Sequence, residues 1–297
     1  MVEKIIIIVG KGSIGLRHAL NLKKLGIKVI FLRSRNLNNE FNEKFFFEET
    51  NDFKFCLNKK PIGSIICTPT IFHPENALKF LRHRIPVYIE KPIGFRVSKY
   101  KINKLKNFSK NLTIHGGYHL RYSKYLNDFF KKIKKKKIIK IEFTWKTNTK
   151  KWHPWENYKE SYTTNYNLGG GVIHTLSHEI DLASSFFKNM NFEKLYYKFD
   201  KKDKIVTKIS AKFDSLDTEI NINLDFYNKI NERKILAMTS SDKYEFDFSK
   251  YPNLQEEAYI LSVKDFISSI KHRKNTISNF DNSLVSYKIC ERLLNET

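Results

Sequence analysis

The feature that most constrains the fold lies at the start of the chain, where a short apolar run leads into a glycine-rich loop. Ile5 to Val9 are five β-branched residues, which is typical of a strand buried on both faces. Glycines follow at positions 10, 12 and 15, and a helical pattern runs from Ile14 to Leu25 and closes at Gly26. A strand, a glycine loop and a helix in this order predict the first unit of a parallel α/β sheet.

The first 120 residues continue this alternation of strand and helix patterns. Further strands are expected at residues 28–32, 64–67, 86–90 and 112–115, with a helix at about 74–82. Such alternation favours parallel strands joined by crossover helices. We therefore predict an N-terminal Rossmann domain over residues 1–120.

The second half of the chain has a different periodicity. Apolar and polar residues alternate at 139–145, 205–213, 220–226 and 244–248, as in half-buried strands. Helical patterns at 170–187, 258–270 and 283–294 flank these runs. We predict an α+β domain over residues 121–297, built on a large, open, mostly antiparallel sheet whose free face is covered by another subunit.

The glycine loop predicts a dinucleotide site. The first glycine permits a tight turn, the second lets the backbone approach a pyrophosphate, and the third lets helix and strand pack closely. The N-terminus of the helix then faces the phosphates. A glycine-rich turn without a ligand is the alternative. The residues expected at the cofactor are Gly10, Gly12, Ser13, Ile14 and Gly15.

The end of the predicted second strand indicates which cofactor binds. A carboxylate about 20 residues after the loop would hold the ribose hydroxyls and repel a 2′-phosphate. This chain has Arg33, Ser34 and Arg35 there instead. Two guanidinium groups and a hydroxyl suit a phosphate, so we predict NADP in preference to NAD, with NAD as an option. The alternative is that the arginines face water.

Further segments, taken with the glycine loop, resemble a known family. They are Leu16-Arg17-His18, Cys67-Thr68-Pro69-Thr70 with His73, Glu90-Lys91-Pro92, and Gly169-Gly170-Gly171 followed by His174, His178 and Asp181. In this order and spacing they resemble the Gfo/Idh/MocA family, which includes glucose-fructose oxidoreductase and inositol dehydrogenase. Residues 152–158, with Ser161 and Tyr162, resemble a branch often associated with bacterial surface-sugar pathways.

The resemblance implies hydride transfer between a nicotinamide and a carbinol carbon of a sugar or polyol. Lys91 would polarise the reacting oxygen, and His178 would move the hydroxyl proton, because imidazole titrates near neutral pH. A surface lysine and a core histidine are the alternatives. The resemblance also extends the cofactor site to Thr68, Pro69, His73, Glu90 and Lys91.

One position departs from the family pattern. Many relatives carry an aspartate one turn before the histidine, whereas this chain has His174 and Thr175 there. On one continuous helix both lie on the face of His178, so we assign His174 to catalysis and Thr175 to the substrate site. Asp181 either orients His178 or is a charge on the helix surface.

Several other residues are candidates for the sugar site. Aromatic rings stack on the apolar face of a pyranose, and a guanidinium can hold a carboxylate or phosphate. With Thr175 and His178, the candidates are Tyr118, Arg121, Trp152, Trp155 and Tyr162. Packing, or a place in a loop that covers the site, is the alternative for each.

The composition limits the partners and the compartment. The formal net charge is +23, but basic residues are spread along the chain, so we expect no nucleic-acid partner, with DNA binding as the alternative. Three cysteines without metal-type spacing suit a reducing compartment, and neither a signal peptide nor a transmembrane stretch is visible. We predict a cytoplasmic protein that contacts no membrane and binds no metal; zinc on His174, His178 and Asp181 is the alternative.

These observations predict an NAD(P)-dependent dehydrogenase or reductase acting on CH–OH groups of a sugar, amino-sugar or sugar-derived acid. A homo-oligomer, either dimer or tetramer, is expected. A non-catalytic, dinucleotide-binding regulator on the same fold is one alternative, favoured by the altered position before His178. An imine or linear-tetrapyrrole reductase is another.

Overall fold

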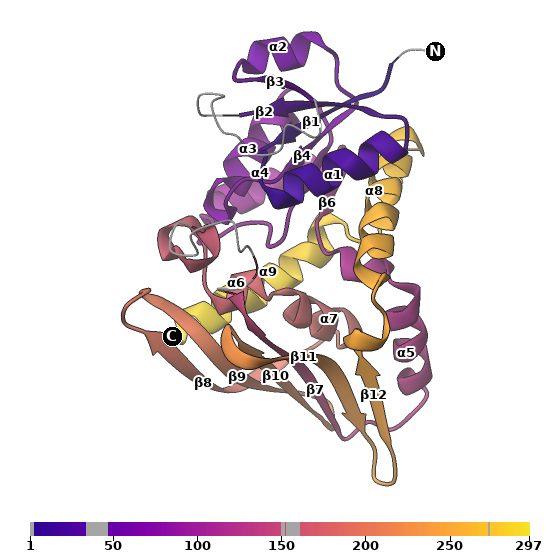
Figure 1. Ribbon diagram of the computed structural model, residues 1–297. Coiled ribbons are helices and arrows are strands. Elements are labelled where there is room, and N and C mark those ends of the chain that lie inside the picture. Colours follow the sequence, from indigo (N-terminus) through magenta and orange to yellow (C-terminus); the bar gives the residue numbers. More distant parts are fainter. Residues whose placement is uncertain (1–2, 34–46, 150–151, 153–160, 273) are drawn as a thin grey trace. The chain divides into compact units, whose positions relative to one another are not determined.

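The computed structural model describes residues 3–33, 47–149, 152, 161–272 and 274–297 of the 297-residue chain (Figure 1). The described residues divide into two compact units. The first comprises Met1–Gly117 and Tyr259–Asp281, and the second comprises Tyr118–Ala258 and Asn282–Thr297. Each unit carries one six-stranded sheet.

The first unit is a Rossmann domain. Its sheet has the order β3-β2-β1-β4-β5-β6 with every pair parallel, which is the strand order of a doubly wound dinucleotide-binding sheet. The strands are β1 (Ile5–Val9), β2 (Lys28–Leu32), β3 (Glu48–Thr50), β4 (Gly63–Ile66), β5 (Val87–Ile89) and β6 (Ile114–Gly116). The helices are α1 (Ser13–Lys24), α2 (Phe53–Asn58), α3 (His73–Leu81) and α4 (Lys99–Ser109), with a 3-10 turn at η1 (Thr70–Phe72).

A late segment of the chain returns to this first unit. Helix α8 (Leu254–His272) places Val263 and Phe266, both fully buried, in the same core cluster as Ile6 and Ile8 of β1. A Cβ atom at Gly63 would lie 3.0–3.2 Å from Ile270, Ile6 and Phe266, so the small residue lets helix and sheet approach closely. The second domain expected at 121–297 therefore differs from the observed division, because the apolar face of α8 is buried on the first sheet.

The second unit is built on the predicted open, mostly antiparallel sheet. The strand order of this sheet is β12-β11-β7-β10-β9-β8. Of its described strand pairs, only β7 with β10 is parallel, and the others are antiparallel. The strands are β7 (Lys140–Asn148), β8 (Asn191–Asp200), β9 (Ile205–Ser215), β10 (Thr218–Asp225), β11 (Tyr227–Met238) and β12 (Lys243–Asp247). The fold class predicted from the sequence is confirmed.

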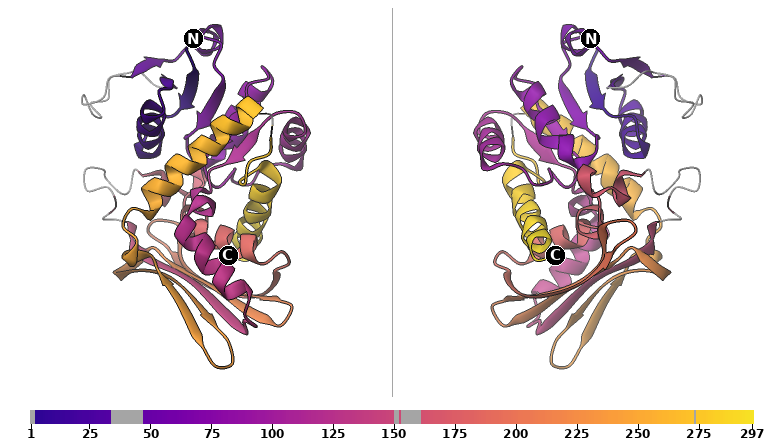
Figure 2. Two further views of the ribbon diagram at one scale, coloured as in Figure 1. Left: turned by 90° about the vertical axis from the view of Figure 1, so that its right-hand side faces the viewer. Right: turned by 90° about the vertical axis from the view of Figure 1, so that its left-hand side faces the viewer.

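Helices cover one face of this second sheet (Figures 1 and 2). They are α5 (Lys124–Lys134), α6 (Val172–Thr175) and α7 (His178–Phe186), accompanied by α9 (Phe280–Asn295) and the short turns η2 (His119–Tyr122), η4 (Tyr162–Thr164), η5 (Tyr166–Leu168) and η6 (Phe248–Lys250). In β10 the buried residues Ile220, Ile222 and Leu224 alternate with polar ones. Alternation of this kind follows from the two-residue repeat of a strand.

The opposite face of the second sheet carries interleaved charges. Glu219 pairs with Lys140 at 3.3 Å and with Lys212 at 3.1 Å, and Lys146 pairs with Glu232 at 2.7 Å. Within the described parts of the chain, no helix is long and apolar enough to cross a bilayer.

Candidate functional site

The glycine loop has the local geometry that a dinucleotide cradle requires. Gly10 has a φ of +98°, and a Cβ atom there would lie 2.8 Å from the Cys67 carbonyl oxygen. A Cβ atom at Gly15 would collide with the Gly10 carbonyl oxygen, whereas one at Gly12 would meet no described atom within 4 Å. Gly10 therefore makes the turn, Gly15 allows close packing and Gly12 leaves space for a ligand, as a cradle demands.

The start of α1 is suited to an anion. Gly12 is the N-cap of the helix, and no described side chain caps it. The N–H groups of the first turn, at Ser13 and Ile14, are therefore available to a pyrophosphate, and the helix dipole favours negative charge at that point. The loop fits the dinucleotide that its sequence predicts, although contact with the cofactor stays a prediction.

The loop after β4 is tied to the loop after β5 by His73. Its Nε2 lies 2.7 Å from the Thr68 carbonyl oxygen and its Nδ1 lies 2.8 Å from the Pro92 carbonyl oxygen. Burial lowers the pKa of His73, although both backbone hydrogen bonds oppose this. Both ring nitrogens of His73 thus contact backbone carbonyl oxygens of the two loops, and its contact with the cofactor stays a prediction.

Glu90 points into the first unit. Its Oε1 lies 2.7 Å from Nε2 of the fully buried His18, and its Oε2 accepts the backbone N–H of Lys91 at 3.1 Å. A Cβ atom at Gly117 would lie 2.9 Å from the Glu90 carboxylate, so that glycine makes room for it. Glu90 thus contacts both His18 and the Lys91 backbone, and its contact with the cofactor stays a prediction. The half-buried Lys91 is followed by a cis bond to Pro92.

His18 belongs to the segment Leu16-Arg17-His18, but the sequence analysis gave it no role. Its ring meets the edges of Tyr88 and Tyr259 at centroid distances of 5.0 and 5.8 Å. It lies one turn beyond Gly15 on α1, on the buried face of that helix. The spacing of three residues from Gly15 could therefore have predicted that His18 is buried. Only the fold shows that His18 contacts the Glu90 carboxylate.

The sheet edge near Arg33, where the sequence analysis expects the cofactor to be selected, contains a carboxylate that sequence reasoning missed. Glu49 of β3 accepts hydrogen bonds from Lys11, in the glycine loop, and from Arg33, whose Nη1 lies 2.8 Å away. Burial raises the pKa of Glu49, but the hydrogen bonds from Lys11 and Arg33 outweigh burial and hold it below its ordinary value. Of the predicted 2′-phosphate ligands, Ser34 and Arg35 lie outside the described residues.

In the second unit, the expected helix over 170–187 is interrupted. Helix α6 ends at Thr175, α7 begins at His178, and Leu176 and Ser177 separate them. His174 and His178 therefore do not share one helix face, which corrects the prediction. His174 Nε2 lies 3.4 Å from a carboxylate oxygen of Glu291.

His178 stands at the first position of α7 and is 4% exposed. Its ring centroid lies 4.5 Å from that of His119 and 6.1 Å from that of Tyr118, nearly perpendicular to both. A second imidazole is thus close to His178, but it comes from η2 rather than from position 174. Thr175 is also buried, at the end of α6.

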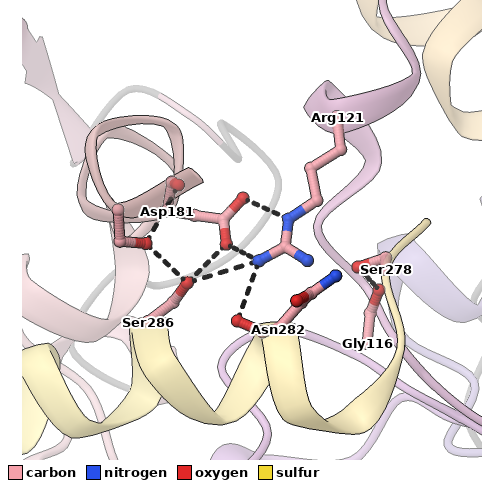
Figure 3. A network of polar contacts seen from close by, with 7 residues as sticks. Gly116, Arg121, Asp181, Ser278, Asn282 and Ser286 are labelled. Carbon is pink, nitrogen blue, oxygen red and sulfur yellow. Dashed lines mark hydrogen bonds and ion pairs between the residues drawn. The ribbon is translucent and has the colours of Figure 1, made fainter. Parts of the chain in front are cut away.

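Asp181 and Arg121 form a buried ion pair (Figure 3). Arg121 donates from Nε to Asp181 at 3.0 Å and from Nη2 to the Asn282 carbonyl oxygen at 3.1 Å, while Ser286 donates to Asp181. Burial raises the pKa of Asp181, and Arg121 opposes this. Asp181 is fully buried and is therefore not the helix-surface charge that was one of its two interpretations, whereas a substrate contact of Arg121 stays a prediction.

The aromatic candidates for a sugar site have different surroundings. Tyr118 is fully buried, and the Arg121 guanidinium lies 5.3 Å from its ring centroid. Trp152 stacks on Trp145 with ring centroids 5.9 Å apart, and its Nε1 donates to Thr147 at 2.9 Å. Tyr162 is 37% exposed. Trp155 lies outside the described residues. Tyr118 is therefore packed in the interior, whereas Trp152 is partly exposed and Tyr162 more so, and a contact of any of them with a sugar stays a prediction.

The surroundings of Cys67 and of the possible metal ligands can also be described. Burial, and then the Glu90 charge, raise the pKa of the Cys67 thiol well above its ordinary value, which is unfavourable for a nucleophile. Among the described residues, no three His, Cys, Asp or Glu side chains converge as metal ligands would.

Comparison with known proteins identifies the first unit. Residues 4–114 match the model of the GFO_IDH_MocA family, described as an oxidoreductase family with an NAD-binding Rossmann fold. The resemblance seen in the sequence is thereby confirmed. No curated protein matches the chain.

Solved structures resemble the fold of the chain over nearly its full length. A myo-inositol 2-dehydrogenase from Lactobacillus plantarum is 17% identical with a TM-score of 0.80, covering 99% of this chain and 96% of that one. KijD10, a 3-ketoreductase from Actinomadura kijaniata solved with NADP, is 12% identical with a TM-score of 0.82, covering 99% and 97%. A scyllo-inositol dehydrogenase from Lactobacillus casei, solved with NAD(H) and scyllo-inositol, is 16% identical with a TM-score of 0.77, covering 99% and 96%.

Proposed function

We propose that the protein is an NAD(P)-dependent oxidoreductase that transfers a hydride between a nicotinamide and a hydroxyl-bearing or keto carbon of a sugar-type substrate. The observation that carries this proposal is the glycine cradle of residues 10–15 in a Gfo/Idh/MocA Rossmann unit, with Lys91 held at the end of β5 by Glu90. The carboxyl ends of parallel strands are where such sheets bind their ligands.

The proposed chemistry divides between two side chains. The bound nicotinamide supplies or accepts the hydride. The Lys91 ammonium polarises the reacting oxygen and lowers the pKa of the hydroxyl, while the His178 imidazole takes or returns the hydroxyl proton. Both functions are needed because a hydride leaves an alcohol carbon only as its hydroxyl loses a proton. We assign the proton transfer to His178 without His174, since α6 and α7 are separate helices.

Supports within each unit keep these two groups in place. Glu90 accepts the Lys91 backbone N–H and is itself held by His18. Asp181, in the first turn of α7, ties the helix that carries His178 to Arg121 and Ser286. Positioning of this kind matters in catalysis because small displacements of a reacting group cost large factors in rate.

A sugar, polyol, amino-sugar or sugar-derived acid is the proposed substrate class. Support comes from the similar structures, which are dehydrogenases of inositols and a 3-ketoreductase. Tyr162 and Thr175 are the described residues that we propose for substrate binding, together with His178.

We propose NADP as the preferred cofactor. Arg33 and Lys11 are basic side chains at the edge of the sheet where the adenosine ribose would bind. Glu49 lies between them and opposes a 2′-phosphate, so the preference is expected to be moderate rather than absolute.

A fluorescence titration of the purified protein with NADPH and with NADH, followed by turnover assays on inositols, aldoses and keto-sugars, tests the proposal. Binding of either cofactor with reduction or oxidation of one substrate class is the expected result. Tight cofactor binding without turnover on any candidate would favour the regulator. Failure to bind either cofactor would overturn the function altogether.

Assembly and location follow as further parts of the proposal. We propose a cytoplasmic homo-oligomer: three cysteines without metal-type spacing suit a reducing compartment, and the described helices of the second unit cover one face of its sheet, which leaves the other face for a neighbouring subunit. Because Glu219, Lys140 and Lys212 pair on that face, an interface there would be polar and would weaken in high salt. Sedimentation at low and high salt tests this assembly.

A further inference from the structure

We propose that Glu49 is the residue that sets cofactor selectivity, because its carboxylate occupies the two cations that the 2′-phosphate of NADP would require. This inference rests on the proposed dinucleotide function and deepens it. The ligand group concerned is the 2′-position of the adenosine ribose, which is a hydroxyl in NADH and a phosphate monoester in NADPH.

The placement of Glu49 follows from the strand order. In the parallel pair β2–β3, Glu49 lies opposite Phe31, and the Arg33 backbone N–H donates to the Thr50 carbonyl oxygen at 2.9 Å. Lys11 is part of the glycine loop that follows β1. The carboxyl ends of the first two strands are the edge at which a Rossmann sheet binds the ribose, so these side chains gather where the 2′-position is recognised.

The contacts commit both oxygens of the carboxylate. Lys11 Nζ contacts Oε1, and Arg33 Nη1 donates to Oε2 at 2.8 Å. The three side chains are only 13–17% exposed, so water screens their charges less than it would on an open surface. The lowered pKa of Glu49 keeps its carboxylate charged at neutral pH. Two cations are therefore already neutralised in part before any ligand arrives.

The two cofactors meet this arrangement differently. A 2′-phosphate carries close to two negative charges at neutral pH, and it must share Lys11 and Arg33 with a like charge. A 2′-hydroxyl has a proton to donate, and a carboxylate is a strong acceptor for it. Glu49 thus favours the hydroxyl and disfavours the phosphate, whereas Lys11 and Arg33 act in the opposite sense.

The decisive variant is Glu49→Gln, which keeps the size of the side chain and removes its charge. Fluorescence titrations should show the ratio of the NADH Kd to the NADPH Kd rising by about tenfold or more, because repulsion is lost and two cations are released. A matched control is Glu48→Gln on the same strand, where the carboxylate pairs with Lys28 at 3.6 Å and Lys59 at 3.4 Å. It changes the net charge equally and should leave the ratio unchanged.

Two results would overturn the inference. If Glu49→Gln weakens both cofactors by the same factor, Glu49 only holds the loop in shape; if both affinities are unchanged, it has no part in binding. Failure of the wild-type protein to bind either cofactor would instead overturn the proposed function, so the two failures are distinguishable.

A second variant keeps the test decisive if Glu49→Gln is poorly folded. Arg33→Gln in the otherwise unchanged chain should weaken NADPH by about tenfold and NADH by much less, because only the phosphate needs the guanidinium. Thermal unfolding of each variant, with and without NADPH, provides the folding control. An equal loss for both cofactors in Arg33→Gln would count against the inference in the same way.

Discussion

The glycine loop of the first unit and the histidine segment of the second unit were both prominent motifs in the sequence. The structure has the local geometry predicted for the glycine loop, but not the single helix predicted for the histidine segment. At Gly10 and Gly15, the local geometry is the one that the motif requires. At His174 and His178, the assumed single helix is broken. Roles set by backbone sterics can be derived from a motif, whereas roles set by side-chain partners depend on where helices begin and end.

Buried carboxylates extend this comparison. Glu90 in the first unit pairs with His18, and Asp181 in the second pairs with Arg121. Each stands beside a residue that we propose for the reaction, yet each contacts the protein interior. A buried charge requires a partner, so the carboxylate nearest a reactive group can be part of its support.

The largest expected effect concerns Lys91. Lys91→Ala should lower kcat by about a thousandfold, because the reacting oxygen loses its polarising charge, while the NADPH Kd stays within about twofold. Steady-state kinetics and a cofactor titration measure the two quantities. Lys99→Ala, which removes an exposed lysine of α4, is the control and should leave both unchanged. Full turnover in Lys91→Ala would remove Lys91 from the mechanism.

Variants of His174 and His178 distinguish proton transfer by His178 alone from proton transfer shared by both histidines. His178→Gln should lower kcat by about a hundredfold and remove one limb of the pH profile of kcat/KM, because the proton-transfer group is lost. His174→Gln should leave that limb in place, since His174 lies on another helix near Glu291. Loss of the same limb in both variants would restore the shared proton transfer that the sequence suggested.

The buried ion pair between Asp181 and Arg121 should contribute to the free energy of unfolding of the protein. Asp181→Asn is expected to lower the free energy of unfolding by about 3–5 kcal/mol, because Arg121 is left buried without its counter-charge. Urea unfolding provides the measurement. Asp128→Asn, which removes an exposed partner of Lys131, should cost no more than about 1 kcal/mol. A stable Asp181→Asn protein without turnover would show that Asp181 acts on the chemistry instead.

The smallest effect is expected on the charged face of the second sheet. Hydrogen bonds from Asn221 and Lys212 lower the pKa of Glu219 to about 2. A depressed carboxyl pKa contributes stability above its ordinary value of 4.5, and this contribution is lost as the pH falls toward 2. Glu219→Gln should therefore cost less than about 1 kcal/mol at pH 7, and this cost should shrink as the pH falls from about 4.5 through about 2. Asp217→Asn, in an exposed turn, is the control; a cost that stays the same from pH 7 to pH 2 would contradict the ion-pair explanation.

Much of the fold was predictable from local patterns. The run Ile5–Val9 and the strand Lys28–Leu32 have the predicted bounds, and the two sheet types follow from continuous and alternating burial. The return of α8 to the first unit was not predictable, because its apolar face does not indicate which of two sheets it will cover.

The sequence by itself determined the alternation of parallel strands and helices in the first unit and the glycine cradle, since these depend on backbone sterics and on hydrophobic repeats among neighbouring residues. Only the tertiary structure decided the partners of the charged groups: Glu49 with Lys11 and Arg33, Glu90 with His18, and Asp181 with Arg121. These partners lie 16 to 72 residues apart. Charges pair through space after the chain has folded, so no spacing along the sequence specifies them.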